Sequence, residues 1–242
     1  MLEVKNITKS FGGVHAIRGS DFVVEKNKVT ALIGPNGAGK TTLFDIIAGF
    51  IVPDSGEIVF EKKNILKLAP FERANLGISR AFQQVRLFRY LTILDHLLLA
   101  EGCDDAKLFK NIFRRQKVSK EKYQKVLEQF GIDRSLDALV SELSYGQRKL
   151  LQIAMCLRKP HQILMLDEPV AGVNKVVQER IENLLLDLKA KGETILLIDH
   201  DMNFVRRLAD KVIALDAGVV IAEGSPEEVL SNSTVIEAYL GE

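Results

Sequence analysis

Cysteine is scarce in this sequence, and its scarcity argues against two common ways of stabilising a fold. Only two cysteines, Cys103 and Cys156, occur among the 242 residues. They lie far apart, form no CxxC pair and have no histidine at metal-ligand spacing, so neither a zinc site nor a disulfide framework is indicated. We therefore expect a fold held together by its apolar core, in a reducing compartment.

Net charge and long apolar runs are lacking as well. The formal net charge is only +1, which gives no global attraction to nucleic acid or to an anionic membrane. No run approaches the roughly 18 uninterrupted apolar residues that are needed to span a bilayer. The N-terminal stretch MLEVKNITKSF does not show the charged-then-apolar pattern of an export signal. We expect a soluble chain without a nucleic-acid partner.

The composition is otherwise that of an ordinary globular protein. Hydrophobic residues make up 47% and charged residues 27% of the chain, which is typical of folded domains and argues against disorder. A chain of this length can bury a large core. It fits either one large α/β domain or a domain that carries an inserted subdomain.

Apolar runs alternate with helical patterns in much of the chain. VTALIG, residues 29–34, leads into a helical stretch, and QILMLDEP (162–169) and ETILLIDHD (193–201) behave in the same way. Between Val176 and Lys191 the apolar side chains recur at helical spacing, which predicts a helix with one buried stripe. The alternation predicts a mainly parallel sheet covered by helices on both faces. The stripe consists of Val177, Ile181, Leu184 and Leu188.

Two other regions break this alternation. LEVKNITKSF (2–11), SDFVVE (20–25) and GEIVF (56–60) resemble antiparallel strands separated by turns, which predicts a second, smaller sheet. From about residue 92 to residue 160 the patterns are helical, which predicts a helical subdomain inserted between two strands of the main sheet.

A basic stretch lies within this helical region. It runs from Lys107 to Lys125 and holds eight basic residues against one acid, Glu121. Charge runs of this kind are usually a solvated face. The functional alternative is a contact with acidic lipid headgroups or a partner loop. The basic residues are Lys107, Lys110, Arg114, Arg115, Lys117, Lys120, Lys122 and Lys125.

The clearest chemical motif is GPNGAGKT, residues 34–41, which matches the phosphate-loop pattern G-x-x-x-x-G-K-[ST] at every fixed position. Gly37 and Gly39 allow successive backbone N–H groups to point at a phosphate, and the following helix adds its positive N-terminal end. Lys40 can then reach the β- and γ-phosphates, and Thr41 can offer its hydroxyl to Mg²⁺. We predict that the chain binds a nucleoside triphosphate.

Acidic residues end the apolar strand ILMLDEP, residues 163–169. A carboxylate there is costly unless a cation meets it, and Mg²⁺ is the natural candidate. Asp167 is predicted to hold the metal, and Glu168 to polarise the attacking water. His200 follows another buried strand, at the strand end where ligands gather in open α/β sheets. A lone histidine is otherwise more often structural than catalytic.

Taken together, these motifs resemble those of the ATP-binding cassette (ABC) ATPases of transporters. The resemblance covers nearly the whole chain and implies an α/β fold of the P-loop NTPase, ABC ATPase type. Its parts are a mainly parallel sheet core with helices, a small antiparallel β-subdomain and an inserted α-helical subdomain. The implied single domain, 1–242, has its nucleotide-binding core in 1–86 and 160–242 and its signature subdomain in 87–159. The motifs are GPNGAGKT, Gln83 in AFQQ, LSYGQ (143–147), LMLDEP (164–169), AGVN (171–174) and His200.

The resemblance also implies a site shared by two subunits. In that family the phosphate loop of one subunit faces the signature sequence of another, so that two ATP molecules are enclosed in a head-to-tail dimer. The residues that would serve the partner's ATP are Ser144, Tyr145, Gly146, Gln147 and Asn174. The helix that we expect over 147–157 would direct its N-terminal dipole at that ATP.

Further roles follow from the same resemblance. Phe11 matches the aromatic that stacks on adenine, Gln83 the glutamine that senses Mg²⁺ and couples to the membrane partner, and Glu168 the general base. Lys40 and His200 complete the catalytic set, and Thr41, Gln83 and Asp167 the metal set. The implied nucleotide-binding residues are Phe11, Gly34, Pro35, Asn36, Gly37, Ala38, Gly39, Lys40, Thr41 and Thr42.

Three positions depart from the family pattern. Tyr145 replaces the first glycine of LSGGQ, Val173 stands where leucine is usual, and Asn174 stands where many members have aspartate. We expect the tyrosine side chain to point away while Gly146 keeps the close approach, so the site should remain intact.

A narrower likeness concerns the transported substrate. LSYGQ, RAFQQVRLF, DEPVAGVN, HDMNFV and IEAYLGE resemble an ATP-binding subunit of the branched-chain amino-acid importers. This implies a homodimer or heterodimer of ATPase subunits, peripheral on the cytoplasmic face of the membrane. It also implies transmembrane permease subunits and an external substrate-binding protein as partners.

Three alternatives remain open at this point. Relatives that energise urea, amide or lipopolysaccharide transport carry similar motifs. A soluble cassette protein of DNA or ribosomes is less consistent with 242 residues, because such proteins usually add coiled coils, zinc modules or a second cassette. An ordinary P-loop kinase or GTPase would leave LSYGQ and His200 unexplained.

Overall fold

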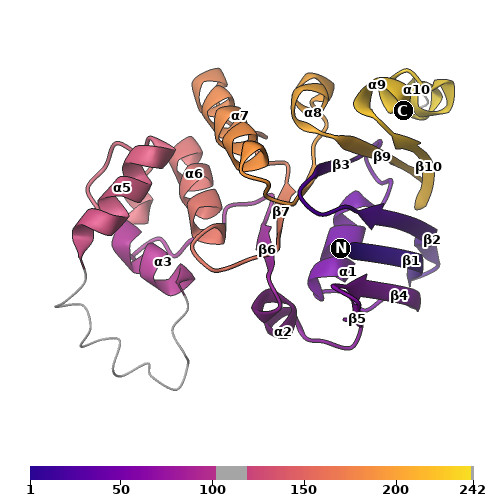
Figure 1. The fold of residues 1–242 in the computed structure, drawn as a ribbon, viewed down its shortest axis with the longest axis horizontal. Helices are drawn as coiled ribbons and strands as arrows, with labels where there is room; N and C mark the ends of the chain where they lie inside the picture. The colour runs from indigo at the N-terminus through magenta and orange to yellow at the C-terminus, as the bar shows by residue number, and fades with distance from the viewer. Residues whose placement is uncertain (102–118, 241–242) are drawn as a thin grey trace. The chain divides into compact units, whose positions relative to one another are not determined.

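The computed structural model describes residues 1–101 and 119–240 (Figure 1). Within these residues the chain forms two compact units, and each unit combines segments that are distant in sequence. The first unit comprises Met1–Arg80, His161–Pro169 and Leu185–Glu242; the second comprises Ala81–Pro160 and Val170–Leu184.

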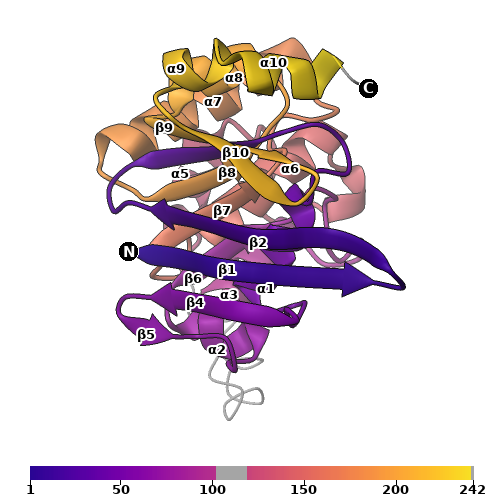
Figure 2. The same ribbon diagram turned by 90° about the vertical axis from the view of Figure 1, so that its right-hand side faces the viewer.

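The first unit contains the small antiparallel sheet that the N-terminal patterns predict. Its strands run in the order β2-β1-β4-β5, with β1 antiparallel to both β2 and β4 (Figure 2). Alternate residues of β1, including Leu2 and Val4, are buried, as expected for a strand with one face on the core. The bounds are β1 Leu2–Phe11, β2 Val14–Val24, β4 Ser55–Phe60 and β5 Lys63–Asn64.

The main sheet of the first unit has six strands in the order β10-β9-β3-β8-β7-β6. Strand β3 is parallel to β8 and β9, and β7 is parallel to β8. Every residue of β3, β7 and β8 is buried, which explains why these strands appear in the sequence as continuous apolar runs. The bounds are β3 Val29–Ile33, β6 Ile78–Ala81, β7 Ile163–Asp167, β8 Ile195–Ile198, β9 Lys211–Asp216 and β10 Val219–Gly224.

Helix α1, Lys40–Ala48, is packed into the core of the first unit. Its Leu43, Phe44, Ile46 and Ile47 are fully buried and belong to one apolar cluster with residues of both sheets. The phosphate loop that precedes α1 is therefore attached to a well-packed helix.

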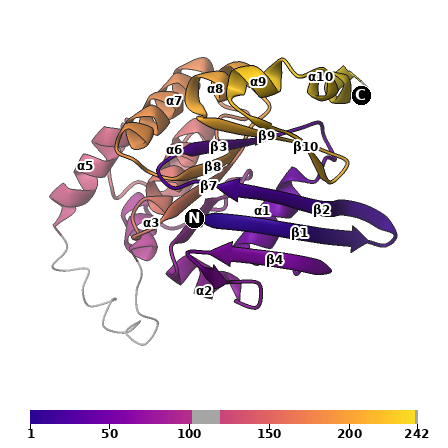
Figure 3. The ribbon, with the colours of Figure 1, turned by 45° about the vertical axis from the view of Figure 1, so that its right-hand side comes forward.

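Short helices complete the first unit. Figure 3 shows α8, α9 and α10 along β9 and β10, and α9 contacts β9 and β10 while α10 contacts β10. Ser225 begins α9 with a capping box: its hydroxyl accepts from the Glu228 backbone, and the Glu228 carboxylate accepts from the Ser225 backbone. The bounds are α2 Pro70–Asn75, α8 Met202–Leu208, α9 Pro226–Leu230 and α10 Ser233–Leu240.

The second unit is helical in its described residues, as predicted. Helix α6 contacts both α3 and α5. The predicted helix 147–157 begins two residues earlier, at Tyr145, because Ser144 serves as its cap. The bounds are α3 Ile93–Ala100, α5 Lys120–Phe130, the short 3₁₀ helix η3 Val140–Glu142 and α6 Tyr145–Cys156.

Helix α7, Lys175–Ala190, runs through residues of both units and matches the predicted helix to within one residue at each end. Of its predicted stripe, Ile181, Leu184 and Leu188 are buried and Val177 is half-buried. In the described parts of the chain no helix is long and apolar enough to span a bilayer.

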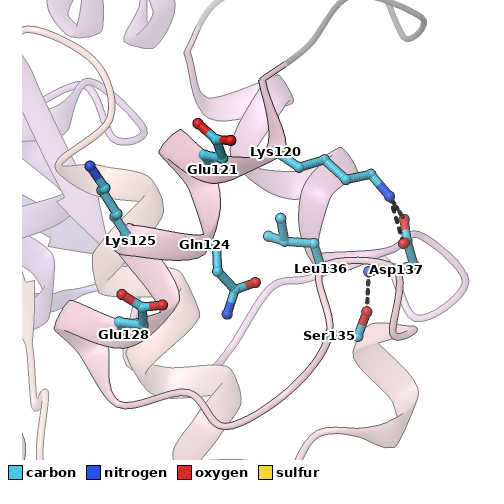
Figure 4. Close-up of a pocket in the computed structure, with 8 residues that line it drawn as sticks. All are labelled: Lys120, Glu121, Gln124, Lys125, Glu128, Ser135, Leu136 and Asp137. Carbon is cyan, nitrogen blue, oxygen red and sulfur yellow. Dashed lines mark hydrogen bonds and ion pairs between the residues drawn. The ribbon is translucent and has the colours of Figure 1, made fainter.

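Part of the basic stretch can be located. Lys107, Lys110, Arg114, Arg115 and Lys117, like Cys103, lie outside the described residues. Of the other three, Lys120 donates to both carboxylate oxygens of Asp137, at 2.9 and 2.6 Å, and Lys122 pairs with Glu101 at 2.8 Å. Lys120 and Lys125 border a pocket of about 450 Å³ that Glu121 and Glu128 also line (Figure 4). The described end of the stretch is thus a surface of mixed charge.

Candidate functional site

The phosphate loop connects β3 to α1. Gly34, Gly37 and Gly39 all have positive φ, which bends the loop back on itself. The N-cap position, Gly39, makes no side-chain cap bond, and the first turn of α1 contains no acidic residue. The first turn of α1 therefore carries no negative charge of its own, and the helix dipole favours an anion there.

Lys40 lies across this loop. Its ammonium donates to the carbonyl oxygens of Gly34 at 2.6 Å and Pro35 at 2.7 Å. Thr41 follows in the first turn of α1 and is exposed. The motif predicts that this ammonium and this hydroxyl serve the phosphates and Mg²⁺, and these roles stay predictions.

Asp167 ends β7 and is almost fully buried. The guanidinium of Arg80, on β6, lies 3.6 Å from the Asp167 carboxylate and 2.6 Å from the carboxylate of Asp45 on α1. Arginine suits this position because its planar fork can face two acids at once. An Asp167 carboxylate and a Thr41 hydroxyl are hard oxygen donors, which fit Mg²⁺.

Glu168 adopts a conformation that is unusual for a residue with a side chain. Its φ is +47°, in the left-handed region, and its backbone N–H donates to the Ile198 carbonyl of β8 at 2.9 Å. Backbone strain of this kind persists where the surroundings impose it, and it is common at functional sites.

The strained turn aims Glu168 at the loop after β8. The Glu168 carboxylate oxygen lies 3.9 Å from His200 Nδ1, and the histidine side chain is 66% exposed. The predicted base and the predicted histidine are therefore brought together within the first unit.

Asp199, beside His200, is a buried acid that the sequence analysis did not assign. Its Oδ1 accepts the backbone N–H groups of His200 and Asp201 at 2.8 and 2.9 Å. Burial raises the pKa of Asp199 to about 6, although these two N–H groups and the charge of His200 oppose the shift. The carboxylate thus shapes the turn that carries His200.

Phe11 ends β1 at the turn into β2. The residue is 46% exposed, and Lys9 Nζ lies 5.3 Å from the centroid of its ring. An exposed aromatic face in this unit is available for stacking, so the predicted contact with adenine stays a prediction that the geometry permits.

The signature residues lie in the second unit, at the N-terminus of α6. The Ser144 hydroxyl accepts from the Gln147 backbone at 3.2 Å, and the Gln147 side chain accepts from the Ser144 backbone at 3.0 Å, which forms a capping box. A Cβ at Gly146 would approach Val177 of α7 to 2.9 Å. Gly146 is therefore required by helix packing, whatever else approaches it.

Two of the three departures from the family pattern, Tyr145 and Asn174, have structural settings of their own. The Tyr145 ring lies over Gly172, where an added Cβ would be 3.4 Å from the ring, and it is 40% exposed. Asn174 directly precedes α7 and caps it, because its side-chain oxygen accepts from the Val177 backbone at 3.0 Å. Gln83, two residues after β6, is exposed. The metal and cross-subunit roles of these residues stay predictions.

Sequence reasoning missed two charged residues of this region. Arg80 is the one charged residue of strand ISRA, and Asp199 directly follows the apolar strand β8, so each places a charge at a main-sheet strand. The argument that singled out Asp167 and Glu168, that a buried charge needs a partner, would have found both.

Comparisons with known proteins agree with this geometry. The family model described as "ABC transporter" matches residues 17–171, and the model described as "Branched-chain amino acid ATP-binding cassette transporter" matches residues 219–242. The high-affinity branched-chain amino acid transport ATP-binding protein BraF of Pseudomonas aeruginosa is 38% identical, covering 100% of this chain and 98% of that protein.

Two solved structures are informative. The ADP conformation of an ATP-binding cassette of an ABC transporter superposes with a TM-score of 0.85 at 37% identity, covering 100% of this chain and 99% of that one. A dimeric cassette in a post-hydrolysis state bound to ADP and Pi gives 0.77 at 26% identity, with coverage of 93% and 99%. Because the ABC transporter model matches well over half of the residues and the likeness to BraF extends over the full length, the chain belongs to the ABC transporter family and is an ATP-binding cassette ATPase.

Proposed function

We propose that this chain is the ATP-hydrolysing subunit of an importer of branched-chain amino acids. The observation that supports the substrate class is the C-terminal match: residues 219–242 fit a model described by this transport system. The full-length likeness to BraF supports the same assignment. The chain itself has no role in contacting the amino acid, which membrane subunits and an external binding protein would handle.

The site residues divide the work of hydrolysis. Lys40 and the N–H groups of the phosphate loop hold the β- and γ-phosphates, and Phe11 stacks on the adenine. Glu168 accepts a proton from the attacking water, and His200 contacts the γ-phosphate. Thr41 and Asp167 of the first unit would hold Mg²⁺, which would neutralise phosphate charge. Arg80 keeps the Asp167 carboxylate oriented, since it lies 3.6 Å from it.

A second copy, or a second ATPase subunit, completes each site. Ser144, Tyr145, Gly146, Gln147 and Asn174 lie together in the second unit, at the starts of α6 and α7. The N-terminus of α6 would meet the γ-phosphate of the partner's ATP. Dimerisation then depends on ATP by mass action, and the dimeric cassette bound to ADP and Pi supports this arrangement.

The membrane subunits would contact the second unit. Phe88 and Tyr90 follow Gln83 and are 66% and 86% exposed. Exposed aromatic side chains of this size are typical of protein interfaces. We place the chain at the cytoplasmic face of the membrane, as a peripheral subunit on its permease partners.

Reconstitution tests the substrate assignment. The chain would be assembled in lipid vesicles with its transmembrane permease subunits and their external binding protein. ATP hydrolysis should rise when the binding protein is loaded with leucine, isoleucine or valine, and labelled leucine should accumulate in an ATP-dependent manner. A Glu168→Gln subunit provides the control, because it should assemble and yet support neither activity.

The same assay with other substrates tests the alternative transport systems. Urea, short amides and lipopolysaccharide would be offered to the same complex. Stimulation by one of these, with none from the branched-chain amino acids, would contradict the proposal and leave the ATPase assignment intact.

A further inference from the structure

The C-terminal helix contacts the phosphate loop directly. The backbone N–H of Gly34 donates to the hydroxyl of Tyr239, on α10, at 2.6 Å. The two residues are 205 positions apart in sequence, and both belong to the first unit. Because β3 ends at Ile33, this N–H is the first one that leaves the strand, and the tyrosine hydroxyl satisfies it.

Gly34 is also held by close packing against β9 and by a hydrogen bond to its carbonyl oxygen. Its φ is +147°, and an added Cβ would lie 2.0 Å from the Leu215 carbonyl oxygen of β9. Only glycine fits such a close approach between backbones. The carbonyl of Gly34 accepts from Lys40 Nζ at 2.6 Å. One residue therefore links Tyr239, through its N–H, to Lys40, through its carbonyl.

Helix α10 is anchored firmly enough to serve this role. The Asn232 side chain accepts from the Thr234 backbone at 2.9 Å and caps the helix, and Val235 is buried. The helix contacts α9 and β10. Tyr239 is therefore presented by a capped and packed element.

The same helix borders the surroundings of His200. A cavity of about 350 Å³ is lined by His200 and Met202 together with Val235, Ile236 and Tyr239 of α10. Leu230 and Leu240 complete its wall. Tyr239 thus lies beside both the start of the phosphate loop and the loop that carries the predicted γ-phosphate histidine.

We propose that Tyr239 is a positioning residue for nucleotide binding. It holds Gly34, and through Gly34 it fixes the phosphate loop on which Lys40 rests, without touching the nucleotide itself. The proposal concerns the ATP site alone and is independent of the transported substrate.

The test is a Tyr239→Phe variant of the full chain, which keeps the ring and removes the hydroxyl. A neutral hydrogen bond of this kind corresponds to about a 2- to 10-fold change in an equilibrium constant. We expect the Kd for ATP with Mg²⁺, measured by titration calorimetry, to rise by about that factor. KM should rise in parallel, while kcat changes little, because a binding element has been loosened.

Tyr123→Phe is the matched control, because it removes a tyrosine hydroxyl in the second unit. The Tyr123 hydroxyl donates to Glu101 at 2.6 Å in the second unit, so Tyr123→Phe also loses one partly buried hydrogen bond. It should leave ATP affinity unchanged. Hydrogen exchange at Gly34 supplies a second readout: the amide should exchange faster in Tyr239→Phe and at the original rate in Tyr123→Phe.

Two results would overturn the proposal. One is an unchanged Kd and an unchanged Gly34 exchange rate in Tyr239→Phe. The other is an equal loss of ATP affinity in Tyr123→Phe, which would assign the effect to general destabilisation.

Discussion

The predicted site residues of the two units carry different physical signatures. In the first unit Asp167 is buried and Glu168 has a left-handed backbone, and neither arrangement stabilises the fold by itself. In the second unit Ser144 and Asn174 cap helices and Gly146 packs against Val177, so each already has a complete structural role. Burial and strain point to function in the first unit. In the second, function is separable from structure only by variants that affect hydrolysis more than stability.

The largest effect should come from Glu168→Gln. The amide preserves size but cannot accept the proton of the attacking water, and general-base catalysis typically contributes about 10²- to 10⁴-fold. We expect hydrolysis to fall by about that factor while ATP binding is retained, which steady-state kinetics and calorimetry would measure. Hydrolysis within threefold of wild type would remove Glu168 from the proposed mechanism.

Lys40→Ala should act on binding. The ammonium that now donates to the Gly34 and Pro35 carbonyls is the point charge placed for the β- and γ-phosphates. Charged hydrogen bonds of about 1.5–3 kcal/mol correspond to a loss of affinity of about 10- to 100-fold. Lys28→Ala, at an exposed lysine that pairs with Glu25, is the control and should bind ATP normally. Equal affinity in the two variants would contradict the phosphate-loop assignment.

Ser144→Arg separates the two roles of the signature residue. Losing the cap should cost about 1 kcal/mol of unfolding free energy. If Ser144 also meets the partner's ATP, hydrolysis should fall by about 10-fold or more, because a bulky side chain at the dimer interface blocks closure. ATP binding to the monomer should persist.

Ser225→Arg is the matched control for Ser144→Arg. Ser225 caps α9 with the same box of bonds. It should lose similar stability in urea unfolding and retain hydrolysis. Equal retention of hydrolysis by Ser144→Arg would reduce LSYGQ to a helix cap.

The smallest effect concerns Asp199, and its sign follows from the pKa. The folded-state pKa is raised to about 6 from 3.8, so the protonated form is favoured by folding, and its stabilisation is lost as pH rises through about 6. Asp199→Asn removes this loss. The variant should therefore be more stable than wild type at about pH 8. We expect the gain to be limited to about 1 kcal/mol, because the new amide NH₂ must find a hydrogen-bond partner.

Urea unfolding at about pH 5 and about pH 8 would check the Asp199 prediction. The advantage of the variant should shrink at the lower pH. The same difference at both pH values would mean that Asp199 does not titrate in this range.

The sequence predicted a strand of the main sheet where the burial of the strand leaves a clear apolar pattern. Strands β3, β7 and β8 were predicted because they are buried on both faces and therefore uniformly apolar. Strands β6, β9 and β10 were not predicted: the polar residues Ser79 and Arg80 interrupt the apolar pattern of β6, and β10 is only partly buried. The turn between β9 and β10 uses a left-handed Ala217 before Gly218, which is not a familiar hairpin pair.

The candidate site was also predicted only in part. Local motifs revealed the phosphate loop, because its glycines and lysine are contiguous. The contacts of Arg80 with Asp45 and Asp167, and of Tyr239 with Gly34, join residues far apart in the chain. Such contacts follow from tertiary packing, which a single sequence does not display.

The most direct test of the shared site is ATP-dependent dimerisation measured by light scattering. Glu168→Gln should be monomeric alone and dimeric with ATP and Mg²⁺, because slowed hydrolysis preserves the nucleotide that forms much of the interface. Glu168→Gln combined with Ser144→Arg should bind ATP and remain monomeric. Dimerisation of the double variant at the same ATP concentration as the single variant would contradict the cross-subunit role of the signature residues.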